Sequence, residues 1–310
     1  MIKKRYFFIV ILSLSALIGY AQQEPIFTQY YLNDIAYNPA IAGSKTYNHL
    51  VIQTRQQWLG FEGAPLSSHI SYHGAVNNRS ALGSSLMYDK TDPSFQGNLQ
   101  FNYSYHIPLD YEKVNLSLGI GAKLLHYSLD FDLEDLPPGQ DPAFSSKAYK
   151  KTTGDASSGV YLYGRNFYIG YSVINLLESS FNDDAGKGFN TNEEVKYYYG
   201  IAGYRFHVVN KDWELEPSIL LRKRKNNDDI YDISGRIFYL NDTWTGVTYR
   251  TNGTLGLAIG FRSNNMHFSY SYDHTFAGEI MQYTKGTHEL TISFKIPSIL
   301  SARHISFWAY

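Results

Sequence analysis

The chain has 310 residues, a formal net charge of −1 from 27 basic and 28 acidic side chains, and no cysteine. The balanced charge argues against a nucleic-acid partner, and the lack of cysteine excludes disulfides and thiolate metal sites. Beyond the N-terminal region, no apolar run reaches the roughly 20 residues of a membrane-spanning helix, which excludes a helical membrane protein. The 28 Tyr, 18 Phe and 4 Trp suit a membrane–water interface, because these rings are apolar while the tyrosine hydroxyl stays hydrated.

The first residues have the three parts of a secretory signal. A basic start at 3–5 is followed by an apolar run over 6–18 and by small residues that end at Ala21. This order predicts a cleaved signal peptide over 1–21 and a mature chain that starts at Gln22. The apolar run is short for a membrane span. An uncleaved anchor helix is the alternative.

Residues 22–46 show neither helical nor strand periodicity and are rich in aromatic and amide side chains. We expect a periplasmic or luminal segment that packs inside the barrel predicted below or across its periplasmic mouth. A barrel much wider than eight strands is not filled by its own side chains, so something else has to occupy or cap its lumen. A plain periplasmic extension is the alternative.

Residues 47–296 alternate between bulky apolar and small or polar side chains, which predicts strands. Met266, Phe268 and Tyr270 share one face, for example, while His267 and Ser269 share the other. We predict an all-β fold, a transmembrane antiparallel up-and-down β-barrel of about 14 strands. The expected strands are 47–57, 65–76, 80–89, 95–107, 113–128, 156–164, 166–174, 195–209, 212–222, 229–240, 243–251, 254–263, 265–274 and 286–296. Residues 297–310 are left as a C-terminal tail.

The connections support the same topology. Every other connection is short, while the intervening ones include the long loops 129–155, 175–194 and 275–285. Outer-membrane barrels have short periplasmic turns and longer external loops. With both termini in the periplasm, this pattern places the chain in the outer membrane of a Gram-negative bacterium as a multi-pass protein. The tight connection at Asn252–Gly253 departs from the pattern.

A soluble β-sandwich or ligand-binding barrel is the competing architecture, since it also alternates apolar and polar residues. It would need a continuous bulky core. Here the face opposite the bulky residues carries small and charged side chains, as in Glu214, Glu216, Ser218 and Arg222. That face suits a hydrated lumen better than a soluble core.

Histidines and charged clusters show no metal-binding pattern. His69 and His73 share one strand face but lie about 13 Å apart, too far to ligate one zinc ion, so we expect hydrated luminal histidines. An acidic group in the longest loop could bind Ca²⁺, but it lacks the glycine of an EF-hand, and a solvated loop is expected. Its members are Asp130, Asp132, Glu134, Asp135 and Asp141.

The basic run at 222–225 is expected to form a solvated hairpin tip, with lipid headgroups or a partner protein as the alternative. No serine-hydrolase, zinc-protease or phosphate-loop motif occurs. We therefore expect no catalytic, cofactor or metal site and no enzymatic activity. A barrel-embedded hydrolase is the alternative.

Two sequence runs are not explained by barrel physics. One contains Asn-Pro-Ala-x-Ala-Gly at 38–43, and the other is Arg-Gln-Gln-Trp-x-Gly-Phe-x-Gly-Ala-Pro at 55–65. Together with the strand at 288–294 they resemble the PorP/SprF family of type IX secretion outer-membrane proteins. The residues that carry the likeness are Phe27, Gln29, Tyr30, Tyr37, Asn38, Pro39, Ala40, Ala42, Gly43, Arg55, Gln56, Gln57, Trp58, Gly60, Phe61, Gly63, Pro65, His73 and Gly74.

The resemblance implies a barrel that contacts outer-membrane lipid and other type IX components, including periplasmic ring and peptidoglycan-associated proteins. It also implies a role in secretion or surface attachment of adhesins with a C-terminal sorting domain, and in gliding motility in some bacteria. We expect docking or anchoring of such an adhesin. A passive porin for small solutes and a structural subunit of the secretion machinery are the alternatives. The extension after residue 296 departs from the family pattern.

Overall fold

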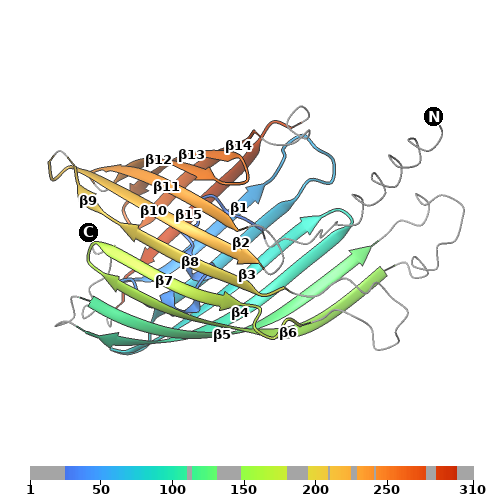
Figure 1. Ribbon diagram of the computed structural model, residues 1–310, viewed down its shortest axis with the longest axis horizontal. Helices are drawn as coiled ribbons and strands as arrows, with labels where there is room; N and C mark the ends of the chain where they lie inside the picture. The colour runs from blue at the N-terminus through green and yellow to red at the C-terminus, as the bar shows by residue number, and fades with distance from the viewer. Residues whose placement is uncertain are drawn as a thin grey trace, which may run out of the picture.

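A computed structural model of the protein describes residues 25–109, 114–130, 148–179, 195–208, 210–224, 229–240, 242–276 and 284–298. The predicted signal peptide and the tail from residue 299 onward lie outside these residues. The described strands form one antiparallel sheet that curls into a barrel (Figure 1). Within the described ranges, no helix has the length and apolar character to cross a membrane.

The strands occupy the stretches whose side chains alternate in character. They are β1 (Asn48–Gln56), β2 (Leu66–Ala75), β3 (Ser80–Thr91), β4 (Ser94–Pro108), β5 (Val114–Asp130), β6 (Ala148–Gly164), β7 (Phe167–Ile174), β8 (Tyr197–Tyr204), β9 (Phe206–His207), β10 (Trp213–Arg224), β11 (Ile230–Tyr239), β12 (Thr243–Arg250), β13 (Thr254–Ser263), β14 (Met266–Thr275) and β15 (Thr287–Ile296). The two-residue β9 continues β8 along the same neighbour, β10. The wall therefore has 14 strand positions, and the predicted antiparallel transmembrane barrel is confirmed.

The first and last strands close the barrel. β1 pairs with β15 from Asn48 opposite Ile296 to Gln56 opposite His288. Each described strand except the short β9 has antiparallel neighbours on both sides. Closure pairs the backbone groups within the wall, which is the condition for a sheet in hydrocarbon.

The two faces of the wall differ as predicted. Side chains that point outward are large, apolar and exposed, as a surface in contact with lipid requires; they include Ile70, Leu86, Ile120, Ile169, Leu257, Ile259 and Leu290. Side chains that point inward are mostly small or polar and are buried; they include Ser71, His73, Asn102, Ser117, Ser172, Ser234, Ser271 and Thr291. The expected outer-membrane location agrees with this arrangement.

The prediction of β6 is wrong at its start. β6 begins at Ala148 rather than at residue 156, and β5 continues to Asp130, so the predicted loop 129–155 shrinks to 131–147. Each of these strands has 17 residues, more than the ~9–11 that cross a bilayer. Residues 131–147, 180–194 and 277–283, in the three predicted long loops, lie outside the described residues.

The two ends of the barrel are unlike. We call the end where β2–β3, β6–β7, β11–β12 and β13–β14 join the turn end, because only two to four residues connect each pair there. We call the opposite end the loop end; β5 and β6 project farthest in that direction, toward the right of Figure 1. Short turns are typical of the periplasmic side.

Candidate functional site

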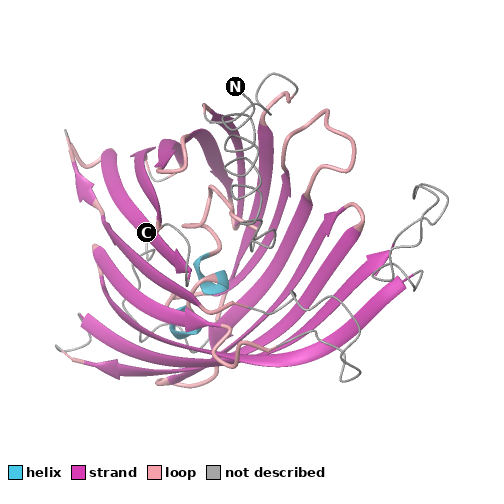
Figure 2. Ribbon diagram, turned by 45° about the vertical axis from the view of Figure 1, so that its right-hand side comes forward, coloured by secondary structure: helices cyan, strands magenta, loops and turns pink. Residues whose placement is uncertain are grey.

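Residues 25–46, here called the luminal segment, lie inside the barrel (Figure 2). From Phe27 to Lys45 every residue is buried except Leu32 and Ala36, which are half-buried. Two short 3₁₀ turns, η2 (Asp34–Ala36) and η3 (Pro39–Ile41), give the segment its compact path. The segment starts beside residues near the loop end and finishes just before Asn48, where β1 begins at the turn end.

The start of the luminal segment is held by Glu289 on β15. One carboxylate oxygen of Glu289 accepts the backbone N–H of Thr28 and the other accepts that of Gln29, each at 2.9 Å. The same carboxylate accepts a bond from Gln53 at 2.8 Å and pairs with Arg55 at 3.2 Å, both on β1. A buried carboxylate needs this many donors to offset the loss of hydration.

Asp273 on β14 extends this anchor. Its Oδ2 accepts the hydroxyl of Thr28 at 2.6 Å and pairs with Arg55 Nη1 at 2.7 Å. Arg55, Asp273 and Glu289 are each at most 5 % exposed. The anchor therefore links three neighbouring strands to one end of the luminal segment through hydrogen bonds that water does not reach.

The Asn-Pro-Ala motif forms the turn at the centre of the luminal segment. The side-chain oxygen of Asn38 caps η3 by accepting the N–H of Ala40 at 2.9 Å, and its amide donates to the carbonyl of Val160 at 2.9 Å. Proline suits the first position of a helical turn because its missing N–H would have no partner there. The motif thus shapes the turn and fastens it to β6.

Glycines in the wall make room for this turn. A Cβ at Gly119 would overlap the backbone of Ala40, and one at Gly159 would overlap the side chain of Asn38. On β3, a Cβ at Gly83 would lie 2.6 Å from the end of Ile35. The wall and the luminal segment are therefore complementary in shape at positions far apart in the sequence.

The end of the luminal segment is bound to β2 and β4. Gly43 donates its N–H to Nδ1 of His73 at 3.1 Å, and the carbonyl of Ala42 accepts from Ser104 at 2.6 Å. Gly43 has a φ of +70°, and a Cβ there would overlap that of Ala81. Glycine is needed at this position for both backbone conformation and space.

Further ion pairs lie between inward side chains of the wall and within the segment. All of these side chains are buried. The pairs are Arg250 with Asp232 at 2.7 Å, Arg236 with Glu216 at 2.5 Å and Lys45 with Asp34 at 2.9 Å. The guanidinium of Arg236 also lies 3.7 Å from the ring centre of Tyr31. The charged lining of the lumen is thus largely neutralised within the protein.

The tyrosine side chains Tyr30 and Tyr31 of the luminal segment are buried and keep their hydroxyl protons. Burial raises the pKa of Tyr30 to about 12, because a phenolate would lose its hydration. The Tyr30 hydroxyl is hydrogen-bonded to that of Ser218 on β10 at 2.9 Å. Tyr31 packs edge-on against Trp244 of β12 at 5.7 Å between ring centres.

The family-motif residues divide between two places. Those from Phe27 to Gly43, together with Arg55 and His73, are buried in the lumen, whereas Gly74 is buried near the turn end of β2 beside the side chain of Asn48. Gln56 is the last residue of β1, and the rest of the second run forms the β1–β2 connection at the loop end, where Phe61 is 46 % exposed. This connection bonds to the chain before β15, because Leu59 donates to Gly286 and Lys285 donates to Leu59, each at 2.8 Å.

The other sequence predictions fare differently. His69 and His73 share the inward face as expected, but the prediction that they are hydrated is wrong: they are 4 % and 0 % exposed, because the luminal segment packs against them. No three metal-ligating side chains come together among the described residues. Arg222 is 5 % exposed and lies 3.8 Å from Asp232 in the lumen, which agrees with the luminal face predicted from the alternation but not with the solvated tip predicted for the basic run. Its inward position follows from the alternation of β10. Of the acidic loop cluster, only Asp130 is described, at the end of β5.

The charged anchor of the lumen was not predicted as a unit. Alternation along each strand indicated that residues such as Glu289 face inward, and this is what the structure shows. Which inward residues meet across the lumen depends on strand register and on the path of residues 25–46. Neither follows from one strand alone.

Comparison with solved structures finds an outer-membrane protein and a channel, among others. Omp33 of Acinetobacter baumannii matches at 9 % identity and TM-score 0.45, over 81 % of this chain and 98 % of Omp33. The TodX monoaromatic hydrocarbon channel matches at 10 % identity and TM-score 0.46, over 85 % of this chain and 94 % of TodX. Comparison with curated proteins finds no match.

The family comparison is decisive. The family described as "Type IX secretion system membrane protein PorP/SprF" matches residues 19–294. The match spans the luminal segment, its anchors and nearly the whole barrel wall. The chain is therefore a member of the PorP/SprF family of type IX secretion outer-membrane barrels.

Proposed function

We propose that this barrel is a closed, non-enzymatic docking component of the type IX system that holds a secreted adhesin, through its C-terminal sorting domain, at the loop end. Family membership supports the association with other secretion components. The observation that carries the proposal is the buried luminal segment, because a filled lumen favours an anchoring role over passage of solutes.

The contacts of the luminal segment argue against the passive porin. Thr28 and Gln29 bind β14 and β15, Tyr30 binds β10, and Asn38 binds β6. These partners lie on widely separated strands of the wall. A segment tied at so many points around the lumen blocks the path that a diffusing solute would use.

The projecting β5–β6 hairpin supplies a docking surface. Between Leu125, paired with Thr153, and Asp130, paired with Ala148, the two strands extend beyond the ends of most others. Function tends to sit on loops that a rigid scaffold holds in place. The hairpin, with the β1–β2 connection near β15, offers a protein partner a fixed surface outside the membrane.

Planar-bilayer conductance tests the closed barrel. We expect the wild-type barrel to show no porin-size conductance, and a variant that lacks 24–44 but keeps the signal to show one. Glu289→Gln and Gly119→Ala, which retain the whole segment, keep the proposal testable if the deletion variant fails to fold. A large steady conductance of the wild-type protein would overturn the closed-barrel proposal.

A shortened hairpin tests adhesin docking. Residues 126–152 are replaced by Asn-Gly, since Leu125 and Thr153 are register partners and Asn-Gly favours a two-residue hairpin turn. Pull-down of tagged barrel from mild detergent, followed by mass spectrometry, should recover a large adhesin with the wild type and lose it with the shortened variant. Recovery of only periplasmic components by both would favour the structural-subunit alternative.

A further inference from the structure

A cavity lies between the luminal segment and the wall at the turn end of the barrel. His49, Trp244, His267 and Lys295, which line it, are each one residue from the end of their strand at the turn end. The cavity leaves about 510 Å³ of space unfilled by atoms, counting the part open to solvent.

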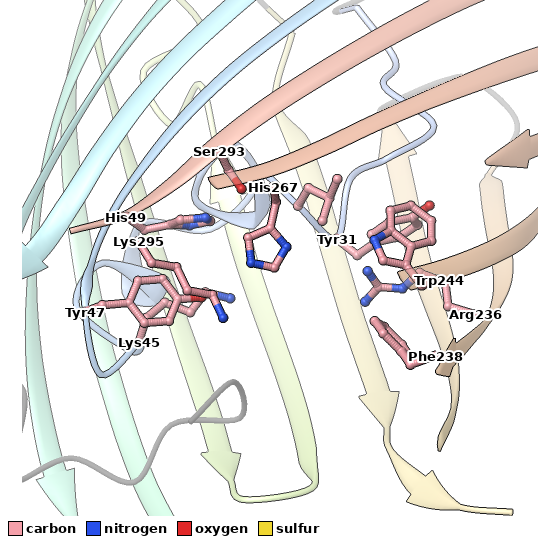
Figure 3. A pocket seen from close by; sticks show the side chains of 11 residues that line it. Tyr31, Lys45, Tyr47, His49, Arg236, Phe238, Trp244, His267, Ser293 and Lys295 are labelled. Atoms are coloured by element: carbon pink, nitrogen blue, oxygen red, sulfur yellow. The ribbon is translucent and has the colours of Figure 1, made fainter. Parts of the chain in front are cut away.

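The lining residues form two groups that face each other across open space (Figure 3). Lys45, His49, His267 and Lys295 form the basic side, and Tyr31, Trp244 and Arg236 form the other. None of the described lining residues is acidic. The luminal segment contributes to both sides, so the cavity exists only while the segment is in place.

Two groups on the basic side have capacity for a ligand. Within the described part of the chain, Lys295 forms no ion pair, and its ammonium lies 5.1 Å from the ring centre of Tyr47. The Nε2 atom of His267 is buried and lacks a hydrogen-bond partner among the described residues. Buried polar atoms normally have a partner, so an anion here would supply what is missing.

The opposite side favours a flat ring. The indole of Trp244 packs edge-on against Tyr31, and the guanidinium of Arg236 lies 5.5 Å from the Trp244 ring centre. Aromatic faces and a planar guanidinium are surfaces on which another ring stacks. A ligand with a ring at one end and a negative charge at the other matches both sides.

We propose that this cavity binds an aromatic carboxylate that enters from the turn end, with the carboxylate at Lys295 and His267 and the ring beside Trp244. Such a group occurs in free aromatic acids and at the C-terminus of a polypeptide that ends in Phe or Tyr. The proposal is independent of adhesin docking at the opposite end of the barrel.

Titration of the full-length barrel in detergent with benzoate tests the site. Isothermal calorimetry should show saturable binding that weakens with salt, and should show none for acetate, which lacks the ring, or benzyl alcohol, which lacks the charge. Lys295→Met should weaken benzoate binding by at least about tenfold, the loss of a charge-assisted hydrogen bond, while Lys295→Arg should retain it. Lys90→Met, at an exposed residue near the loop end, is the matched control.

Two peptides separate the sources of the ligand. A tripeptide that ends in Phe with a free carboxylate should compete with benzoate if the site takes a chain end, whereas only the free acid binds if it takes a small molecule. The amidated peptide should not compete in either case. Binding of benzyl alcohol as tight as benzoate, equal binding by wild type and Lys295→Met, or no benzoate binding at millimolar concentration would each overturn the proposal.

Discussion

Glu289 and Thr28 lie 261 positions apart in the sequence, yet the carboxylate of Glu289 accepts the backbone N–H of Thr28 at 2.9 Å. The neighbouring N–H of Gln29 binds the other oxygen of the same group. Because both bonds involve main-chain donors, they fix the path of the luminal segment whatever its side chains do. This pair joins the start of the luminal segment to the last strand of the barrel.

Replacing Glu289 with Gln should loosen the luminal segment without dissolving the barrel. The amide has one acceptor oxygen in place of two and leaves Arg55 with one fewer buried partner, at a cost of about 3–5 kcal/mol for a broken buried pair. Hydrogen exchange followed by mass spectrometry should show faster exchange over 25–46. Lys90→Gln, which breaks an exposed pair with Asp92, should leave exchange unchanged. Equal protection in both variants would show that the anchor is not needed.

A methyl group at Gly119 should displace the central turn of the luminal segment. Its Cβ would overlap the backbone of Ala40, and overpacking of this kind costs about 1–3 kcal/mol. Gly235→Ala is a matched control, because no atom lies within 4 Å of its Cβ. We expect Gly119→Ala to raise single-channel conductance in planar bilayers and Gly235→Ala to behave as wild type. The idea fails if the two variants conduct alike.

A charge at Leu257 should destabilise the membrane-embedded barrel. Leu257 is 57 % exposed in the middle of β13, on the outward face. Arginine at the bilayer midplane costs about 2–4 kcal/mol, whereas near the interface it costs about 0–1 kcal/mol. Reversible unfolding in lipid vesicles should therefore separate Leu257→Arg from Leu240→Arg, which is exposed at the turn after β11. Similar values for both would contradict the placement of Leu257 in the hydrocarbon layer and of Leu240 near its edge.

Alkaline solution should release the luminal segment. The pKa of Tyr30 is raised to about 12 by burial, so the stabilisation from its neutral form is complete below about pH 10 and is lost as the pH rises toward 12. Limited proteolysis of the region 25–46 should increase over that interval. In the Tyr30→Phe variant, the part of the increase in proteolysis that comes from ionisation of Tyr30 should disappear. An unchanged proteolysis curve in the variant would assign the alkaline effect to other groups.

Sequence periodicity predicts the barrel wall closely, because alternate residues of each strand face lipid and the barrel interior and differ in character accordingly. The strand at Met266–Thr275 is an example, with lipid-facing rings and small polar inward side chains. The sequence does not predict the start of β6, because residues 148–155 are mostly small or polar and lack apolar residues at every second position. A hairpin that extends beyond the membrane does not need such a row.

The anchors of the luminal segment were harder to foresee. The Asn-Pro-Ala run indicated a special turn at 38–40, but its seat on Gly119 and Gly159 involves strands more than 70 residues away. Such complementarity depends on how closely two backbones approach. A single sequence carries no trace of that distance.

The anchor at Glu289 also bears on how the barrel is assembled. Its carboxylate lies on the last strand and accepts hydrogen bonds from Gln53 of the first strand and from Thr28 of the luminal segment. Closure of the barrel and binding of the luminal segment are therefore coupled, because the same buried carboxylate takes part in both. We expect a polypeptide without residues 25–46 to pair β1 with β15 more slowly, because Glu289 would then have only its hydrogen-bond partners on β1.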